Sequence, residues 1–249
     1  MIIRKTPEQI QAMRRAGRAL AEVYKDLEQA VKPGANVLEL DKLVERSIRL
    51  RGATPSFLGY RGFPASICAS VNDVVVHGIP TDRALQEGDI FSADLGLILE
   101  GWHADCARTY PVGKIEAETA RLLTVTDQSL AAGIEQCRPG NHMTDISHAI
   151  QTVVEAAGFS IVREYAGHQI GRQLHEGDIW VSNFGTPGKG PKLQPGMVFA
   201  IEPMVNAGGW QTRVLDDGWT VVTEDGSLSA HFEHTVAITA EGPLVLTAA

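Results

Sequence analysis

The most informative feature of this 249-residue chain is an internal repeat. The segment LQEGDIFSAD at 85–94 recurs as LQPGMVFAIE at 193–202, and each copy ends on a carboxylate. A second pair of segments lies upstream at almost the same offset. It consists of Lys-Pro-Gly at 32–34 and Arg-Pro-Gly at 138–140, each followed by similarly spaced apolar residues. Two repeated blocks in the same order predict a duplicated unit whose halves face each other across a pseudo-two-fold axis.

The repeat also constrains the domain organisation. We predict one α+β domain over 1–249 with halves 1–113 and 114–249, because each half alone would bury its faces poorly. Apolar spacing and capping residues predict helices that cover a curved, mainly antiparallel sheet. The expected helices span about 7–31, 37–51, 116–137 and 144–157. The expected strands are 66–71, 74–77, 90–99, 103–111, 160–162, 198–205, 213–215, 220–223 and 231–239.

Composition narrows the class of protein and its compartment. The net charge of −8 argues against bulk binding to nucleic acid or an anionic membrane. No apolar run approaches the roughly 18 residues of a membrane helix, and the first residues lack the apolar core of a signal peptide. The three cysteines, Cys68, Cys106 and Cys137, show no CxxC spacing, which indicates free thiols in a reducing compartment. We therefore expect a cytoplasmic protein.

Two aspartates bracket a predicted hairpin. Asp94 and Asp105 flank a stretch that should turn near 99–101. A turn centred between Leu99 and Glu100 places the aspartates directly opposite, and a slip leaves them diagonal, with side-chain stems about 4.5–8 Å apart. Two partly buried carboxylates this close repel unless a cation lies between them. The alternative is a pair of solvated surface acids.

Two further acids and several histidines extend this pattern. Glu202 and Glu233 lie within apolar strands, where an acid needs a basic partner or a metal ion. Each alone would favour a salt bridge, but four such acids favour a shared metal cluster. His168 lies in a Gly-flanked turn, and His77 and His175 are unspecific when taken singly. The remaining histidines are interpreted as surface or structural residues: His103, His142, His148, His231 and His234.

Several motifs then recur in order along the whole chain. They are HGIP at 77–80, D-x-G-x-x-x-x-G-x-x-x-D at 94–105, GH at 167–168, HE at 175–176, EPMVNAG at 202–208 and FEHT at 232–235. Together these segments resemble the type I methionine aminopeptidases of the pita-bread metallopeptidase superfamily. The resemblance implies a duplicated pita-bread fold. It also implies removal of the initiator methionine from nascent proteins whose second residue is small.

The resemblance further implies a two-metal centre and a metal-bound hydroxide as the nucleophile. Asp105 and Glu233 would bridge the two ions, Asp94 would hold one of them, and His168 and Glu202 would hold the other. Oxygen-rich ligation with one imidazole suits Mn(II), Fe(II) or Co(II) at least as well as Zn(II). The sequence does not choose among these ions.

Roles for the catalytic and substrate-binding residues follow from the same resemblance. Glu202 would shuttle a proton, while His77 and His175 would hydrogen-bond the reacting amide, with His175 stabilising the oxyanion. The methionine side chain would occupy an apolar pocket. Its expected lining is Tyr60, Phe63, Cys68, His77 and Trp219. Ordinary core packing is the alternative interpretation of the three larger aromatic residues.

The chain departs from the family pattern at several positions near the site. Gln169 replaces a glycine, Leu174 an aromatic residue and Val76 a cysteine, and the HE-x-P segment has Asp178 in place of proline. Phe57 and His231 also differ from common members. None of these changes removes a ligand, so they bear on substrate range and turnover.

The expected partners are nascent polypeptide N-termini, with a transient ribosome contact, no membrane, no direct nucleic-acid binding and a monomeric state. Two alternatives remain at this point. One is a proline-directed peptidase of the same fold, such as an Xaa-Pro aminopeptidase or prolidase. The other is a non-catalytic binding member that docks on ribosomes or chromatin.

Overall fold

Helices α1 and α2 begin where capping residues predict them. The computed structural model describes residues 2–248. Helix α1 (Pro7–Ala30) starts with a capping box between Thr6 and Gln9, and α2 (Val37–Leu50) starts at Asn36, whose side chain accepts from the Glu39 amide at 3.1 Å. Helices α3 (Ala117–Glu135) and α4 (Met143–Ala156) occupy the equivalent places in the second half. All four predicted helices are therefore confirmed to within two residues at each end.

The sequence repeat is also a repeat of backbone conformation. Gly34 and Gly140, which follow the repeated prolines, have φ values of 86° and 96°. Gly88 and Gly196, which precede the repeated strands, have φ values of 92° and 94°. These are left-handed conformations that glycine adopts without steric cost. Each half thus uses the same turns to enter its second helix and its long strand.

The main sheet has seven strands and joins the two halves. Its order is β1-β4-β5-β14-β15, with β2 also paired to β4 and β9 also paired to β14, and every pairing is antiparallel. The bounds are β1 Thr54–Pro55, β2 Ile67–Val71, β4 Ile90–Leu99, β5 Trp102–Pro111, β9 Val198–Ile201, β14 Glu233–Thr239 and β15 Gly242–Val245. The halves meet where β5 pairs with β14, Ala107 opposite Glu233 and Cys106 opposite His234. We call this pairing the central seam.

Three smaller sheets complete the fold. Their strand orders are β13-β10-β6, β11-β12-β3 and β7-β8. The bounds are β3 Val74–Val76, β6 Ser160–Ile161, β7 Ala166–His168, β8 Trp180–Ser182, β10 Met204–Asn206, β11 Thr212–Val214, β12 Val221–Thr223 and β13 Ser229–His231. A short 3-10 turn, η1, spans Tyr60–Gly62.

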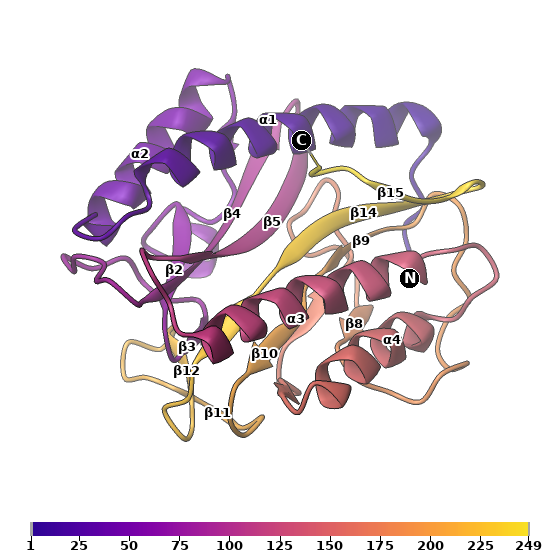
Figure 1. Cartoon of the computed structure of the whole chain (residues 1–249). Coiled ribbons are helices and arrows are strands. Elements are labelled where there is room, and N and C mark those ends of the chain that lie inside the picture. The colour runs from indigo at the N-terminus through magenta and orange to yellow at the C-terminus, as the bar shows by residue number, and fades with distance from the viewer. Residues whose placement is uncertain (1, 249) are drawn as a thin grey trace.

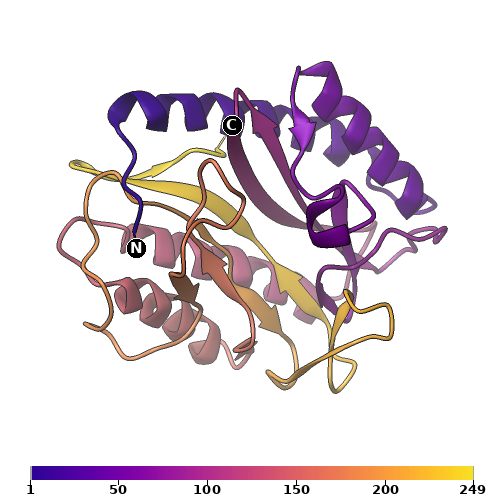
Figure 2. The ribbon, with the colours of Figure 1, turned by 180° about the vertical axis from the view of Figure 1, so that it is seen from behind.

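The helices cover one face of the main sheet. In Figure 1, α3 and α4 lie in front of the strands of the second half and α1 crosses the upper ends of β4 and β5; in Figure 2 the same helices lie behind the strands. Each half has its own apolar core, one between α1, α2 and β4–β5, and one between α3, α4 and β9–β14. None of the described helices is long and apolar enough to cross a membrane.

The hairpin between the two aspartates has the second of the two predicted registers. The turn is centred between Glu100 and Gly101, since Leu99 pairs with Trp102. Both turn residues have positive φ, 54° and 76°, the conformation of a two-residue hairpin turn that matches the strand twist. Asp94 is therefore opposite Ala107 rather than Asp105, so the directly opposed alternative is wrong and the diagonal one is confirmed. Because the pairing shifts by two residues, the aspartates stay on one face, in the diagonal arrangement.

Two predicted long strands are interrupted. The run 198–205 divides into β9 and β10 at Glu202 and Pro203, and the run 231–239 divides into β13 and β14 at Phe232. Proline has no amide hydrogen to donate to a strand partner, which explains the first break. Each break lets one strand leave the main sheet for the smaller β13-β10-β6 sheet.

Candidate metal centre and substrate pocket

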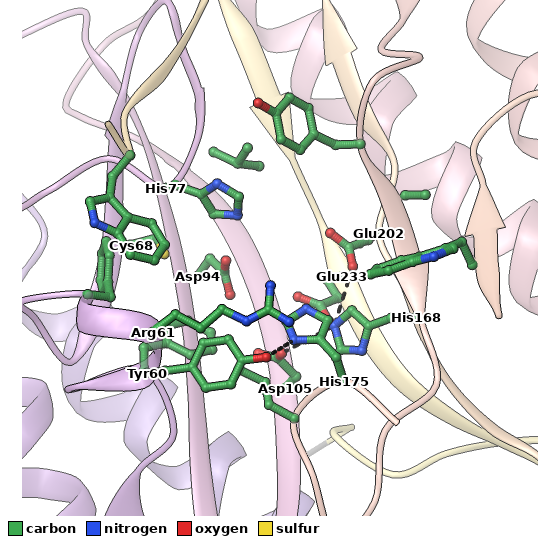
Figure 3. Close-up of a pocket in the computed structure, with 18 of the residues that line it drawn as sticks. Tyr60, Arg61, Cys68, His77, Asp94, Asp105, His168, His175, Glu202 and Glu233 are labelled. Atoms are coloured by element: carbon green, nitrogen blue, oxygen red, sulfur yellow. Dashed lines mark hydrogen bonds and ion pairs between the residues drawn. The ribbon is translucent and has the colours of Figure 1, made fainter. Parts of the chain in front are cut away.

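A cavity of about 480 Å³ lies between the two halves of the chain. Its lining includes all the predicted metal ligands and all the predicted substrate-binding residues. In Figure 3, His77, Cys68 and Asp94 approach from the first half, while His168, His175 and Glu202 approach from the second. Residues that are far apart in the sequence thus converge on one space.

The acidic ligands are placed by the central seam. Asp94 lies on β4 and Asp105 on β5, two residues apart in register because Gly96 pairs with Asp105. Glu233 begins β14 directly opposite Ala107, the residue that also faces Asp94. Glu202 follows the last residue of β9, where the strand leaves the sheet. The four carboxylates therefore gather around the point where the two halves join.

His168 completes the cluster. The sequence predicted that this histidine lies in a turn just after a strand. It is instead the last residue of β7, so that prediction is wrong by one residue. Its Nε2 atom is 3.8 Å from Asp105 Oδ2 and 3.7 Å from Glu202 Oε1. Ligand atoms of Asp105, His168 and Glu233 all lie within 4.8 Å of one another. Spacing of this kind fits ligand atoms that share a cation.

Burial and mutual repulsion oppose ionisation of the four acids. Burial, reinforced by nearby Asp105, raises the pKa of Asp94 well above its ordinary value. Burial likewise raises the pKa of Asp105 to about 7. The pKa values of Glu202 and Glu233 are also raised well above normal, first by burial and then by the neighbouring carboxylates. Without a cation, this cluster holds protons that ordinary surface acids release.

The donor set fits divalent metal ions. Among the described residues, none of the four carboxylates forms an ion pair with a lysine or arginine, so the salt-bridge alternative has no partner. Asp94 Oδ1 and Glu233 Oε1 are buried and have no hydrogen-bond partner. Burial lowers the pKa of His168 to about 3, so its imidazole is neutral and able to bind a metal near neutral pH. Buried unpaired oxygens beside a neutral imidazole are suited to a cation.

These shifts predict how the stability of the metal-free protein depends on pH. A carboxyl with a raised pKa binds its proton more tightly in the folded state, so stability falls as pH rises through the folded-state pKa. Buried histidines with a lowered pKa have the opposite effect, because they make stability rise with pH. That rise ends near pH 6.5, where the histidines of the unfolded chain lose their protons. We therefore expect the melting temperature of EDTA-treated protein to fall between about pH 7 and 8.5.

Metal binding should displace the retained protons. Titration of the metal-free protein with Mn(II) at pH 7 in two buffers of different ionisation enthalpy measures their release by calorimetry. A melting temperature that rises from pH 7 to 8.5, together with no proton release, would contradict the raised pKa values.

Two histidines flank the cluster on the substrate side. The rings of His175 and His168 have centroids 4.0 Å apart, and His175 Nδ1 is 2.8 Å from the Tyr60 hydroxyl, the contact drawn in Figure 3. Burial, then nearby Arg61, lowers the pKa of His175 to about 4. His77 directly follows β3, with a φ of 58°, and burial lowers its pKa as well. Both lowered pKa values keep the imidazoles neutral near pH 7.

The predicted methionine pocket is an apolar recess beside these histidines. Phe63 and Trp219 pack edge to face with ring centroids 5.2 Å apart, and Trp219 also contacts His77 at 6.3 Å. Cys68 is buried on β2, where it pairs with Asp94. Leu174 lines the same cavity. The aromatic residues thus pack together and also face the cavity. Ordinary core packing and a place in the pocket wall therefore both describe them.

His231 fits its interpretation as a structural residue. It is buried, and its Nε2 atom lies 3.8 Å from Glu202 Oε2. His103 fits its structural interpretation, since it is buried with Nδ1 2.9 Å from Ser56 Oγ.

The sequence interpretation missed several residues at the cavity mouth. They come from η1, from the segment before β7 and from β8, and no sequence motif marks them. They are Arg61, Glu164, Tyr165 and Trp180.

The chain is similar to known metallopeptidases over nearly its whole length. The sequence pattern described as metallopeptidase family M24 matches residues 11–240. The chain is 53% identical over 247 residues to methionine aminopeptidase 1 of Bacillus subtilis (strain 168), covering 99% of each chain. It is 45% identical over 245 residues to methionine aminopeptidase of Escherichia coli (strain K12), covering 98% of this chain and 92% of the relative.

Solved structures of other proteins are also similar to this chain. Methionine aminopeptidase from Rickettsia prowazekii superposes with a TM-score of 0.98 at 43% identity, covering 100% of both chains. The prolidase from Pyrococcus furiosus superposes with a TM-score of 0.81 at 21% identity, covering 99% of this chain and 66% of the prolidase, which shows a shared fold alone. The predicted pita-bread α+β fold is confirmed by these structures and by the antiparallel sheets described above. On the sequence pattern and on these identities, the chain belongs to metallopeptidase family M24.

Proposed function

We propose that this chain is a metal-dependent methionine aminopeptidase that removes the initiator methionine from nascent proteins with a small second residue. The observation that carries the proposal is the convergence of four carboxylates, two of them buried and two half-buried, and one buried imidazole on a cavity with an apolar recess. The 53% identity to the Bacillus subtilis enzyme over the full length supports the same activity. We further propose that residues 1–249 act as one catalytic domain, because both halves supply ligands.

The cluster is suited to two divalent ions. In our assignment, Asp105 and Glu233 would contribute to both ions, Asp94 would hold one of them, and His168 and Glu202 would hold the other. This assignment agrees with the short distances from His168 to Asp105 and Glu202. When bound, such ions lower the pKa of water toward about 7 and polarise the scissile carbonyl. Mn(II), Fe(II), Co(II) and Zn(II) all fit this mixed carboxylate and imidazole set.

The chain's own residues position the substrate and move protons. Glu202 lies beside His168 in the cluster, where its carboxylate is placed to take a proton from water and pass it to the leaving amine. We assign the Tyr60 hydroxyl as the donor to His175 Nδ1, which leaves the proton on Nε2. That N–H can then donate to the developing oxyanion. His77 faces the same space from the first half and would hydrogen-bond the substrate backbone.

The recess beside the cluster accounts for the choice of methionine. Phe63, Cys68 and Trp219 form apolar, polarisable walls that suit a thioether. Carboxylates outnumber cationic side chains among the described residues that line the cavity, and this attracts a protonated α-amine. An enclosed cavity with both features favours a short unblocked N-terminus over an internal peptide segment.

The cellular setting follows from the activity. Nascent N-termini are the expected substrates, with transient ribosome contact, in the cytoplasm and as a monomer. Analytical ultracentrifugation should give a mass near the 26.8 kDa of the chain. A stable dimer at micromolar concentration would contradict the monomer.

A pair of peptides tests the activity directly. We expect the purified protein with Mn(II) or Co(II) to release methionine from Met-Ala-Ser, but not to cleave an Xaa-Pro dipeptide. EDTA should abolish cleavage, and added metal should restore it. EDTA should also lower the melting temperature or leave it unchanged. Cleavage of the proline substrate alone would support a prolidase-type enzyme, and no cleavage of either peptide would support a binding protein. A clear rise in melting temperature with EDTA would contradict the metal site.

A further inference from the structure

A buried ion pair lies directly behind the site and has no part in the chemistry described so far. Lys5, in the segment before α1, contacts the carboxylate of Glu176, the residue next to His175. The two side chains are 1% and 5% exposed, whereas most other ion pairs of the described chain are solvent-exposed. Neither residue lines the cavity. Burial of both charges is costly in water-free surroundings, so the pair needs a structural reason.

Glu176 is the central contact of the loop that follows His168 and carries His175. Its carboxylate accepts from the Arg172 amide at 2.6 Å, and its own amide donates to Gln169 O at 2.8 Å. These two bonds close the segment 169–176 on itself. His168 precedes this closed loop and His175 lies within it. The orientation of the His175 ring therefore depends on how Glu176 is held.

Lys5 ties this loop to the repeated turn of the second half. Its amide donates to Gly196 O at 2.6 Å, and the neighbouring Arg4 donates through Nε to Pro195 O at 2.8 Å. The 193–196 turn leads into β9, which ends just before Glu202. One extended N-terminal segment thus connects the strand of a proposed ligand with the loop of a proposed oxyanion donor.

We infer that Lys5 and Glu176 are positioning residues that hold His175 at the distance from the metal cluster that the reaction requires. This inference rests on the proposed aminopeptidase function. Glu176 acts by closing the 169–176 loop, and Lys5 acts by neutralising and anchoring the Glu176 carboxylate. A displacement of about 1 Å in a catalytic group can cost on the order of 10²-fold in rate.

The space around the pair supports this coupling. A methyl group added at Gly171 would lie 2.3 Å from Glu176 Oε1 and 2.7 Å from Lys5 Cε. The φ of Gly171 is not positive, so alanine is allowed there by the backbone and only the contact opposes it. Gly171→Ala therefore pushes on the ion pair from the opposite side without changing a charge.

The test compares Lys5→Met, Glu176→Gln, their combination and Gly171→Ala with the wild type on Met-Ala-Ser at saturating Mn(II). We expect Lys5→Met and Gly171→Ala to lower kcat by about 10- to 100-fold, with KM changed less than about threefold, because the oxyanion contact is made in the transition state. The double variant should lose no more than the worse single variant, since the two residues act as one unit.

Matched controls separate positioning from general damage. Lys25→Met removes a lysine from an exposed ion pair with Glu22 and should retain the wild-type kcat. Histidine-selective NMR of the metal-free protein should show a shifted or broadened His175 ring signal in Lys5→Met, whereas the His148 signal stays unchanged. If Lys5→Met does not fold, the double variant removes both charges at nearly constant volume and carries the test.

The outcomes are distinct. A wild type that fails to cleave Met-Ala-Ser refutes the proposed function. An active wild type together with folded Lys5→Met and Gly171→Ala of unchanged kcat refutes the positioning role alone. Losses that multiply in the double variant, or an unchanged His175 signal, also refute it.

Discussion

Glu233→Ala is expected to abolish turnover while leaving the protein folded. Glu233 lies at the central seam within a cluster of ligand atoms that span less than 4.8 Å, so its loss removes a ligand assigned to both ions. Loss of about 4 kcal/mol of transition-state stabilisation corresponds to roughly a 10³-fold fall in kcat. The metal-free variant should melt no lower than the metal-free wild type, because one of four neighbouring carboxyl groups that oppose one another's ionisation is gone.

The rate of peptide cleavage and the metal content of Glu233→Ala are measured in parallel. The peptide assay and elemental analysis of dialysed protein give the two quantities, and Glu135→Ala on the exposed face of α3 is the control. Activity near the wild-type level in Glu233→Ala would refute the assignment of the cluster.

His175→Ala is expected to lower kcat by about 10²- to 10³-fold, the usual cost of losing one oxyanion donor. The KM for Met-Ala-Ser should change much less, because the hydrogen bond strengthens only as charge develops on the carbonyl oxygen. Metal content should stay at the wild-type level, since His175 is assigned no metal ion.

Two further variants serve as comparisons for His175→Ala. His148→Ala replaces an exposed histidine on α4 and should behave as the wild type. Tyr60→Phe removes the 2.8 Å contact to His175 Nδ1 and should give a smaller loss of kcat than His175→Ala. A rise in KM with unchanged kcat in His175→Ala would assign this residue to ground-state binding instead.

Much of the architecture could be predicted because it is encoded locally. Thr6, Gln9 and Asn36 carry the capping signals of α1 and α2, and these helices begin where predicted. The duplicated blocks predicted equivalent halves, and the matching φ values of Gly88 and Gly196 agree with that prediction. Strands of two to four residues, such as β1, β7, β8 and β15, are too short to show an alternating pattern.

The remaining features depend on contacts between distant parts of the chain. The register of the hairpin was decided by the positive φ of Glu100, which the residue type did not indicate. Arg61 lines the cavity and His231 lies beside Glu202, and neither could be placed from a motif, because only folding brings them to the site. The pairing of Lys5 with Glu176 joins positions 171 residues apart, and neither residue indicates the other. Motifs predicted which residues meet at the site, but not which residues support them.

The central seam has a consequence for how this protein could have arisen and how it could be divided. Asp94 and Asp105 lie on one side of it, and Glu202 and Glu233 lie on the other. Neither half alone carries the complete ligand set, so an ancestral half-length chain would have required a second copy to bind the same ions. Cutting the connection between β5 and α3 should give two inactive fragments whose reassociation restores activity, with a rate that depends on the concentrations of both pieces.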